Sequence, residues 1–149
     1  MKKKERILVI CVHNASRSQM ADEYFRRFGG DLFEVESAGI KPGVLNPVVV
    51  ELLREDGIDI TGKKPQSVHE LHAAGARYDY VFAVCDPETR DACPIFPAEK
   101  KRIHWPFPDP SKIEGDFQQK LEQVRPIQHD IRRMVQAFVD GYRAGQNSI

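Results

Sequence analysis

The chain has 149 residues, a length typical of one domain whose core needs no disulfide or metal to hold it. It carries 22 Lys and Arg residues against 22 Asp and Glu residues, so its formal net charge is zero. This balance argues against non-specific binding of nucleic acid or of a membrane surface. We expect one cytoplasmic domain over residues 1–149, without a targeting or membrane-spanning segment.

The first predicted strand is the apolar run from Ile7 to Ile10, which ends at Cys11. A short polar loop follows and leads into a helix that begins near Arg17. A strand that passes into a helix start points successive backbone N–H groups at one small volume, at the positive end of the helix dipole. This pattern predicts a site for a tetrahedral oxyanion.

Cys11 opens this loop and Arg17 closes it, with five residues between them. The guanidinium can clamp two oxygens of an oxyanion while the thiolate faces the central atom, and Ser18 can donate to the sulfur. The alternative is that Cys11 is a small buried hydrophobe, but the strand before it, the helix after it and Asn14 favour the nucleophile. The predicted substrate-binding residues are Val12, His13, Asn14, Ala15, Ser16, Arg17 and Ser18.

The middle of the chain continues the alternation of strands and helices. The pattern predicts a strand over 32–37, a helix that begins at Pro47 after its cap Asn46, and a short helix opened by Ser67. A further strand over 80–84 follows them.

The last third begins with a surface loop over 85–97, followed by a fourth strand over 102–105. From Asp116 to Tyr142 the apolar residues keep helical spacing. Pro126 lies inside this run, and we expect it to break or kink the helix and split off its first turns.

Strands that alternate with helices predict an α/β domain with a mostly parallel sheet. Ligands of such sheets bind beyond the carboxyl ends of the strands, where the loops after Ile10, Val84 and Trp105 lie. All three cysteines and Asp109 fall at those ends. Their coincidence favours one shared site.

Asp109 lies between Pro108 and Pro110, which hold it rigidly. It could therefore act as a general acid that protonates the departing oxygen. Its alternative role is that of a turn aspartate, and the residues alone do not separate the two.

Three cysteines, an odd number, do not fit a secreted disulfide framework. If the loop that carries Cys85 and Cys93 approaches Cys11, Cys85 can attack the sulfur of the Cys11 adduct and Cys93 can then attack Cys85. The alternative is a pair of idle surface thiols. No metal site is predicted, because the chain has no Cys-x2-Cys pair and its five histidines are scattered.

Several motifs of one known family occur here in that family's order. They are Cys11-Val12-His13-Asn14-Ala15-Ser16-Arg17-Ser18-Gln19-Met20-Ala21, Ser37-Ala38-Gly39, Gly57-Ile58-Asp59-Ile60, Cys85, Cys93-Pro94, His104-Trp105, Phe107 and Asp109-Pro110. On these residues, nearly the whole chain resembles the thioredoxin-coupled arsenate reductases, which share the low-molecular-weight protein tyrosine phosphatase fold. The resemblance implies a four-stranded parallel sheet flanked by helices in a three-layer sandwich.

The same resemblance implies a reaction, the reduction of arsenate to arsenite in arsenic detoxification. Cys11 attacks arsenate held by the loop amides and Arg17, and Asp109 protonates the leaving oxygen. Cys85 then attacks the adduct, and Cys93 takes over a disulfide that thioredoxin reduces. It also implies that Asn14 holds the loop and Ser18 tunes the thiolate. Phosphate and sulfate would compete for the site, no tightly bound cofactor is expected, and a monomer is the expected form.

The chain departs from the family at several positions. His13 stands where Gly is usual, Ser16 where a further Cys is common, and the spacing from Cys85 to Cys93 is one residue longer. Some members bind potassium near the loop through an Asn, an acid, a Ser and a later Asp. Asn14, Asp22 and Ser37 match three of these ligands, whereas Gln66 stands at the fourth.

Three alternatives stay open at this point. A low-molecular-weight tyrosine phosphatase would use Cys11, Arg17 and Asp109 alone, although Ser111-Lys112 stands where such enzymes carry aromatic residues. A non-enzymatic oxyanion-responsive redox sensor or binding module would keep the loop without turnover. The electron donor could also be a glutaredoxin or mycothiol system, with thioredoxin favoured by the three cysteines.

Overall fold

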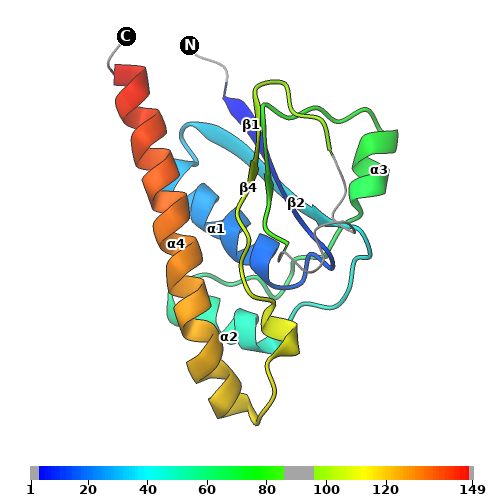
Figure 1. The fold of residues 1–149 in the computed structure, drawn as a ribbon, viewed down its shortest axis with the longest axis vertical. Helices are drawn as coiled ribbons and strands as arrows, with labels where there is room; N and C mark the ends of the chain where they lie inside the picture. Colours follow the sequence, from blue (N-terminus) through cyan, green and yellow to red (C-terminus); the bar gives the residue numbers. More distant parts are fainter. Residues whose placement is uncertain (1–3, 86–95, 148–149) are drawn as a thin grey trace.

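The computed structural model describes residues 4–85 and 96–147, and helices separate its first three strands along the chain (Figure 1). In chain order the elements are β1 (Glu5–Cys11), α1 (Arg17–Gly29), β2 (Phe33–Gly39), α2 (Pro47–Glu55), α3 (Val68–Ala73), β3 (Tyr80–Ala83), β4 (Lys101–His104), a 3-10 helix (Pro110–Lys112) and α4 (Phe117–Asn147). The predicted α/β class is confirmed, and each predicted strand is present to within a few residues.

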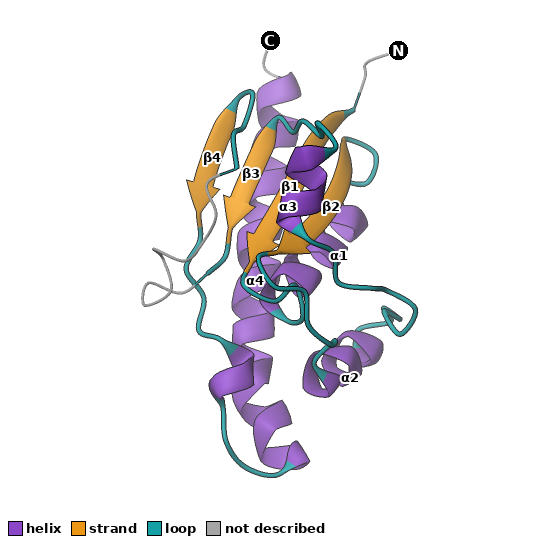
Figure 2. Cartoon of the chain, turned by 90° about the vertical axis from the view of Figure 1, so that its right-hand side faces the viewer, coloured by secondary structure: helices purple, strands orange, loops and turns teal. Residues whose placement is uncertain are grey.

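The four strands form one parallel sheet in the order β2-β1-β3-β4. Figure 2 shows their arrowheads pointing to the same end of the molecule. Hydrogen bonds from Val84 to Ile10 (3.0 Å) and from Trp105 to Ala83 (2.8 Å) extend the pairing beyond the strand ends. The segments that follow β1, β3 and β4 therefore emerge side by side, as predicted for the loops around a shared site.

Both faces of the sheet are covered, which explains the unbroken apolar run in β1. Ile7 and Val9 point into a core formed with α1 and α4, whereas Leu8 and Ile10 point into a smaller core beneath α3. This alternation follows from the two-residue period of a strand. Figure 1 shows α1 and α4 on one side of the sheet and α3 on the other, which gives three layers.

The two predicted helix caps are confirmed. Asn46 accepts a hydrogen bond from the backbone N–H of Val48 through its side chain and starts α2 (3.0 Å). Ser67 accepts from the N–H groups of His69 and Glu70 and starts α3. Each cap satisfies a donor that the first helical turn leaves without an intrahelical partner.

The expectation that Pro126 would split the last helix is wrong, because α4 is one helix of 31 residues that continues through Pro126. Proline removes the hydrogen bond to the carbonyl of Glu122, and both residues are exposed, so water can reach that carbonyl. Val124 and Ile127 are buried on either side and hold the two halves against the core. Although α4 is long, none of the described helices is apolar enough over a sufficient length to cross a membrane.

Tyr24 joins α1 to two other parts of the fold. Its hydroxyl donates to Asp56 (2.8 Å) beyond α2 and accepts from Gln128 (2.9 Å) on α4. Burial, reinforced by the neighbouring Asp56 carboxylate, raises the pKa of Tyr24 to about 12. The phenol therefore stays protonated at neutral pH and keeps its role as a donor.

The predicted surface loop over 85–97 lies mostly outside the described residues, which exclude 86–95. Its two described flanks, Cys85 and Phe96, are buried. They enter different cores, with Cys85 on the α1 and α4 side and Phe96 on the α3 side.

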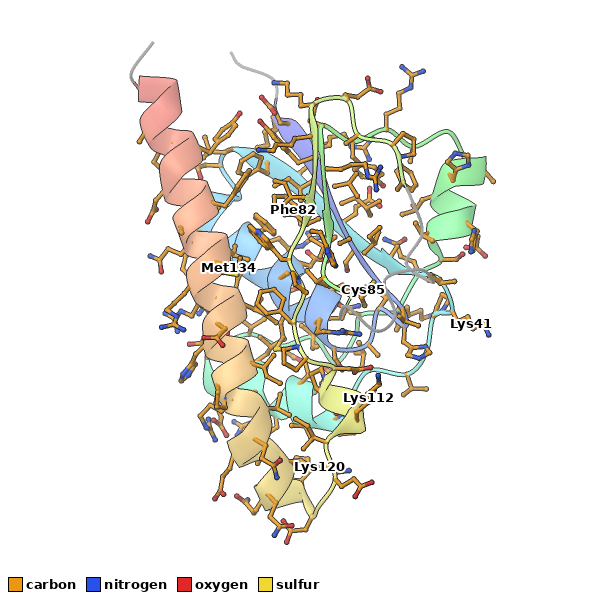
Figure 3. The ribbon with its side chains drawn as sticks, viewed as in Figure 1. Lys41, Phe82, Cys85, Lys112, Lys120 and Met134 are labelled. Carbon is orange, nitrogen blue, oxygen red and sulfur yellow. The ribbon has the colours of Figure 1, made fainter. Side chains whose placement is uncertain are left out.

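We predict that Phe82→Ala destabilises the fold by about 3–5 kcal/mol, because it removes a fully buried ring from the core. Phe82 lies between the sheet and α4 (Figure 3), where its ring centroid is 4.9 Å from that of Phe25 and 5.0 Å from that of Phe138. Urea unfolding measures the loss. Val44→Ala is the control, because Val44 is 88% exposed and its truncation should change stability by less than about 0.5 kcal/mol. A similar small change for Phe82→Ala would contradict the packing.

Candidate active site

The thiol of Cys11 is buried where β1 ends and the loop to α1 begins. The backbone N–H of Asn14 donates to its Sγ at 3.2 Å, and the hydroxyl oxygen of Ser18 lies 2.9 Å from the same sulfur. Asn14 Nδ2 donates to Ser18 Oγ at 2.8 Å, which leaves the Ser18 proton available to the sulfur. Two donors thus converge on Sγ, an arrangement that stabilises a thiolate.

Asn14 adopts the left-handed backbone conformation, with φ of 53°, which Asn tolerates better than most side chains. Gln66 donates its N–H to Asn14 Oδ1 at 3.1 Å, and Gln19 Nε2 donates to the Asn14 carbonyl at 2.9 Å. The bond from Gln66 determines which end of the amide faces Ser18. The sequence singled out Asn14 and Ser18 but missed the support from Gln19 and Gln66.

We call residues 11–17 the thiol loop. Four of its carbonyls accept backbone hydrogen bonds of 2.9 to 3.3 Å from the segment 40–46, which follows β2. The accepting residues are Cys11, Val12, His13 and Ala15. Because these carbonyls point toward the segment 40–46, the N–H groups of the loop face the opposite side, where they can bind an anion.

The start of α1 offers further donors, because it has no side-chain cap. Ser16 at the N-cap makes no cap hydrogen bond, and the first turn has no acidic residue. The backbone N–H groups of Ala15, Ser16 and Ser18 donate to no other residue that the structure describes. Buried N–H groups need partners, and at the positive end of a helix an oxyanion supplies them.

Arg17 and Asp109 meet across the site, although they are far apart in the sequence. The Arg17 guanidinium is 3% exposed, donates to the Phe107 carbonyl at 3.0 Å and lies 3.5 Å from Asp109 Oδ2. Asp109 Oδ1 accepts from the N–H and hydroxyl of Ser111 at 2.9 and 2.8 Å. One oxygen therefore forms the turn while the other faces Arg17, and the role of Asp109 as a general acid stays a prediction.

Cys85 lies at the end of the strand next to β1, and it shares a buried cluster with Cys11 and Phe107. His104 Nε2 lies 3.0 Å from the Cys85 carbonyl oxygen. Figure 3 labels Cys85 at the end of the sheet from which the thiol loop emerges. Cys85 is disulfide-bonded, whereas Cys11 is a free thiol. Cys93 lies outside the described residues, so the Cys85–Cys93 pairing stays a prediction.

A buried acid, Asp22, lies one turn along α1 from Ser18. Its carboxylate accepts from Ser37 Oγ at 2.8 Å, from Lys63 Nζ at 3.0 Å and from Arg26 Nε at 2.5 Å. Two protein cations thus already neutralise the acid that matched a potassium ligand, which does not fit a metal ion there. Elsewhere in the described residues, no cluster of His, Cys, Asp and Glu side chains could hold a metal.

Gly39 ends β2 directly opposite Cys11, and the sequence identified it only as part of the Ser37-Ala38-Gly39 motif. A Cβ atom at this position would lie 2.7 Å from the Val12 carbonyl oxygen and 2.8 Å from the Asn14 nitrogen. Only glycine lets the thiol loop pass this close to β2. A glycine at the end of the neighbouring strand was the signal that could have identified it.

Known sequences match most of the chain. The family model described as low molecular weight phosphotyrosine protein phosphatase matches residues 6–139. An arsenate reductase of Halalkalibacterium halodurans is 34% identical over 137 residues, which cover 92% of this chain and 96% of that protein.

Solved structures of arsenate reductases are similar to this fold. An arsenate reductase in the phosphate binding state matches with a TM-score of 0.72 at 24% identity, over 92% of this chain and 98% of its own. The thioredoxin-dependent arsenate reductase of Corynebacterium glutamicum matches with a TM-score of 0.62 at 29% identity, over 99% of this chain and 65% of its own. The first likeness shows the shared fold.

We predict that Gly39→Ala lowers the free energy of unfolding by about 1–3 kcal/mol, because the new methyl group meets backbone that cannot give way. Thermal and urea unfolding measure the change. Gly62→Ala is the matched control, because nothing lies within 4 Å of its added Cβ. Equal stability of the two variants would show that the thiol loop does not need this close approach.

Proposed function

This chain belongs to the low molecular weight phosphotyrosine protein phosphatase family, and we propose that within this family it is an arsenate reductase. The observation that carries the proposal is the buried Cys11 thiol, which faces the uncapped start of α1 beside Arg17. The similarity to arsenate reductases over nearly the full length of both chains supports it. A reducing cytoplasmic compartment suits a free catalytic thiol.

In this proposal the substrate is arsenate, and residues 12–18 bind it. Loop N–H groups and the Arg17 guanidinium donate to the oxygens, while Cys11 Sγ faces the arsenic atom. Phosphate and sulfate are tetrahedral oxyanions of similar size, so both should compete for the same donors. The phosphate-binding state of a structural neighbour is consistent with this expectation.

The first chemical step forms a sulfur–arsenic bond. The Cys11 thiolate attacks arsenic(V), and one oxygen leaves as water after it takes a proton from Asp109. The contact between Asp109 Oδ2 and Arg17 supports this role, because it places the carboxyl group at the edge of the same donor set.

The second step transfers two electrons to arsenic. Cys85 attacks Cys11 Sγ, the sulfur–arsenic bond breaks with its electron pair on arsenic, and arsenite leaves behind a Cys11–Cys85 disulfide. Cys93 then attacks Cys85, which frees Cys11 and leaves a Cys85–Cys93 disulfide. Thioredoxin reduces that bond with two electrons. Support comes from the buried cluster that Cys11 shares with Cys85 and from the thioredoxin-dependent neighbour.

A second activity, hydrolysis of small aryl phosphates, follows from the same nucleophile, clamp and acid. Water would then resolve a phospho-cysteine on Cys11 without the other cysteines. Ser111 and Lys112 follow Asp109 and Pro110, a pair without an aromatic ring to stack on phosphotyrosine. We therefore propose this activity as a side reaction.

We predict that Asp109→Asn lowers kcat for arsenate about 10²–10⁴-fold, because the amide cannot give up a proton to the leaving oxygen. Inorganic phosphate should still inhibit the variant, because the loop donors remain. Steady-state kinetics measure both quantities. Asp140→Asn, at an exposed position on α4, is the control and should behave as the wild type. Full activity of Asp109→Asn would remove Asp109 from the mechanism.

We predict that the wild type sustains NADPH consumption with arsenate, thioredoxin and thioredoxin reductase, whereas Cys93→Ser releases one arsenite per enzyme and stops. Cys93 has no part in hydrolysis, so both proteins should hydrolyse aryl phosphate equally. Cys11→Ser should lose all turnover but retain oxyanion binding. If arsenate drives no NADPH oxidation while both proteins hydrolyse aryl phosphate, the chain is a phosphatase. Binding without any turnover in the wild type would indicate a sensor or binding module.

A further inference from the structure

The start of α1 has the sequence pattern of a capping box, yet the box is not formed. Ser16 at the N-cap is followed three positions later by Gln19, a pattern in which each side chain accepts from the backbone N–H of the other residue. Ser16 makes no cap hydrogen bond, and Gln19 Nε2 donates instead to the Asn14 carbonyl at 2.9 Å. Gln19 Oε1 is buried without a partner among the described residues. The helix therefore begins without the two bonds that its own sequence offers.

The backbone of Ser16 differs from that of the capping residues elsewhere in this fold. Asn46 and Ser67, which cap α2 and α3, have extended conformations with ψ of 119° and 129°. Ser16 has φ of −138° and ψ of −84°. Capping residues typically have the extended conformation, and Ser16 departs from it while its hydroxyl is engaged elsewhere.

Asn46 contacts this part of the loop at two points. Its backbone N–H donates to the Ala15 carbonyl at 3.0 Å, and its Nδ2 donates to Ser16 Oγ at 3.2 Å. Its Oδ1 accepts from the N–H of Val48 at 3.0 Å and caps α2. One side chain thus caps the second helix and holds the hydroxyl that would otherwise cap the first.

We propose that Asn46 is a positioning residue that keeps the Ser16–Gln19 capping box open, so that the first N–H groups of α1 stay available to the oxyanion. The inference rests on the oxyanion site of the proposed function and names what prevents that site from closing on its own side chains. A Ser hydroxyl that caps the helix would compete with the oxyanion for the same donors. A cap of ordinary strength would weaken oxyanion binding about fivefold.

The test measures how inorganic phosphate protects Cys11 from alkylation by iodoacetamide, with the modified peptide quantified by mass spectrometry. Asn46→Ser removes Nδ2 but keeps an oxygen that can cap α2. We expect the phosphate concentration for half-protection to rise about fivefold, with the unfolding transition little changed. Val44→Ala, on the same segment but with an exposed side chain, is the control. If Asn46→Ser does not fold, Asn46→Thr replaces it, because threonine also caps helices.

The decisive variant is Asn46→Ser combined with Ser16→Ala, which removes the hydroxyl that closes the box. We expect the double variant to bind phosphate more tightly than Asn46→Ser alone, a rescue that a purely structural role of Asn46 would not produce. Losses that add, or a double variant no better than the single one, would overturn the inference while leaving the oxyanion site in place. If phosphate fails to protect Cys11 in the wild type, the oxyanion site itself fails, and the proposed function with it.

Discussion

Asn14 is the residue on which the geometry of the site depends, because all of its polar groups are used. Its N–H donates to Cys11 Sγ, its Nδ2 to Ser18, and its two oxygens accept from Gln19 and Gln66. These bonds hold a left-handed backbone conformation that turns the thiol loop around the sulfur. Loss of any one of them would leave a buried polar group unpaired, and such groups are costly in a protein interior.

The parallel sheet determines which segments can support that loop. β2 pairs with β1 in a register that places Gly39 opposite Cys11, so the chain after β2 runs beside the thiol loop and engages its carbonyls. On the other side of β1 lies β3, and Cys85 follows shortly after the end of that strand. β4 then leads to Asp109, which meets Arg17. Each neighbour of the loop thus arrives from a different strand end, as expected for a parallel sheet.

Some stabilising interactions that the sequence offers are not formed at the site, as far as the structure describes it. The first turn of α1 lacks the cap that α2 and α3 possess, and the oxygen of Gln19 stays without a partner among the described residues. The unsatisfied N–H groups at the start of α1 destabilise the free protein, but an incoming oxyanion can accept from them without rearrangement. Packing elsewhere compensates for them, chiefly the aromatic cluster in which partly buried Phe138 packs against buried Phe82 and Phe25 between the sheet and the helices.

The order of the elements could be predicted from the sequence, because apolar periodicity and the side-chain caps at Asn46 and Ser67 act over a few residues. It also singled out Cys11, Arg17 and Asp109, since thiol, guanidinium and carboxyl chemistry can be recognised without a fold. Local rules failed at Pro126, where buried neighbours on both sides override the helix-breaking effect of proline. The contacts of Gly39, Gln66 and Asn46 with the loop could not be predicted in this way, because they join segments that are distant in sequence and depend on how the folded chain brings those segments together.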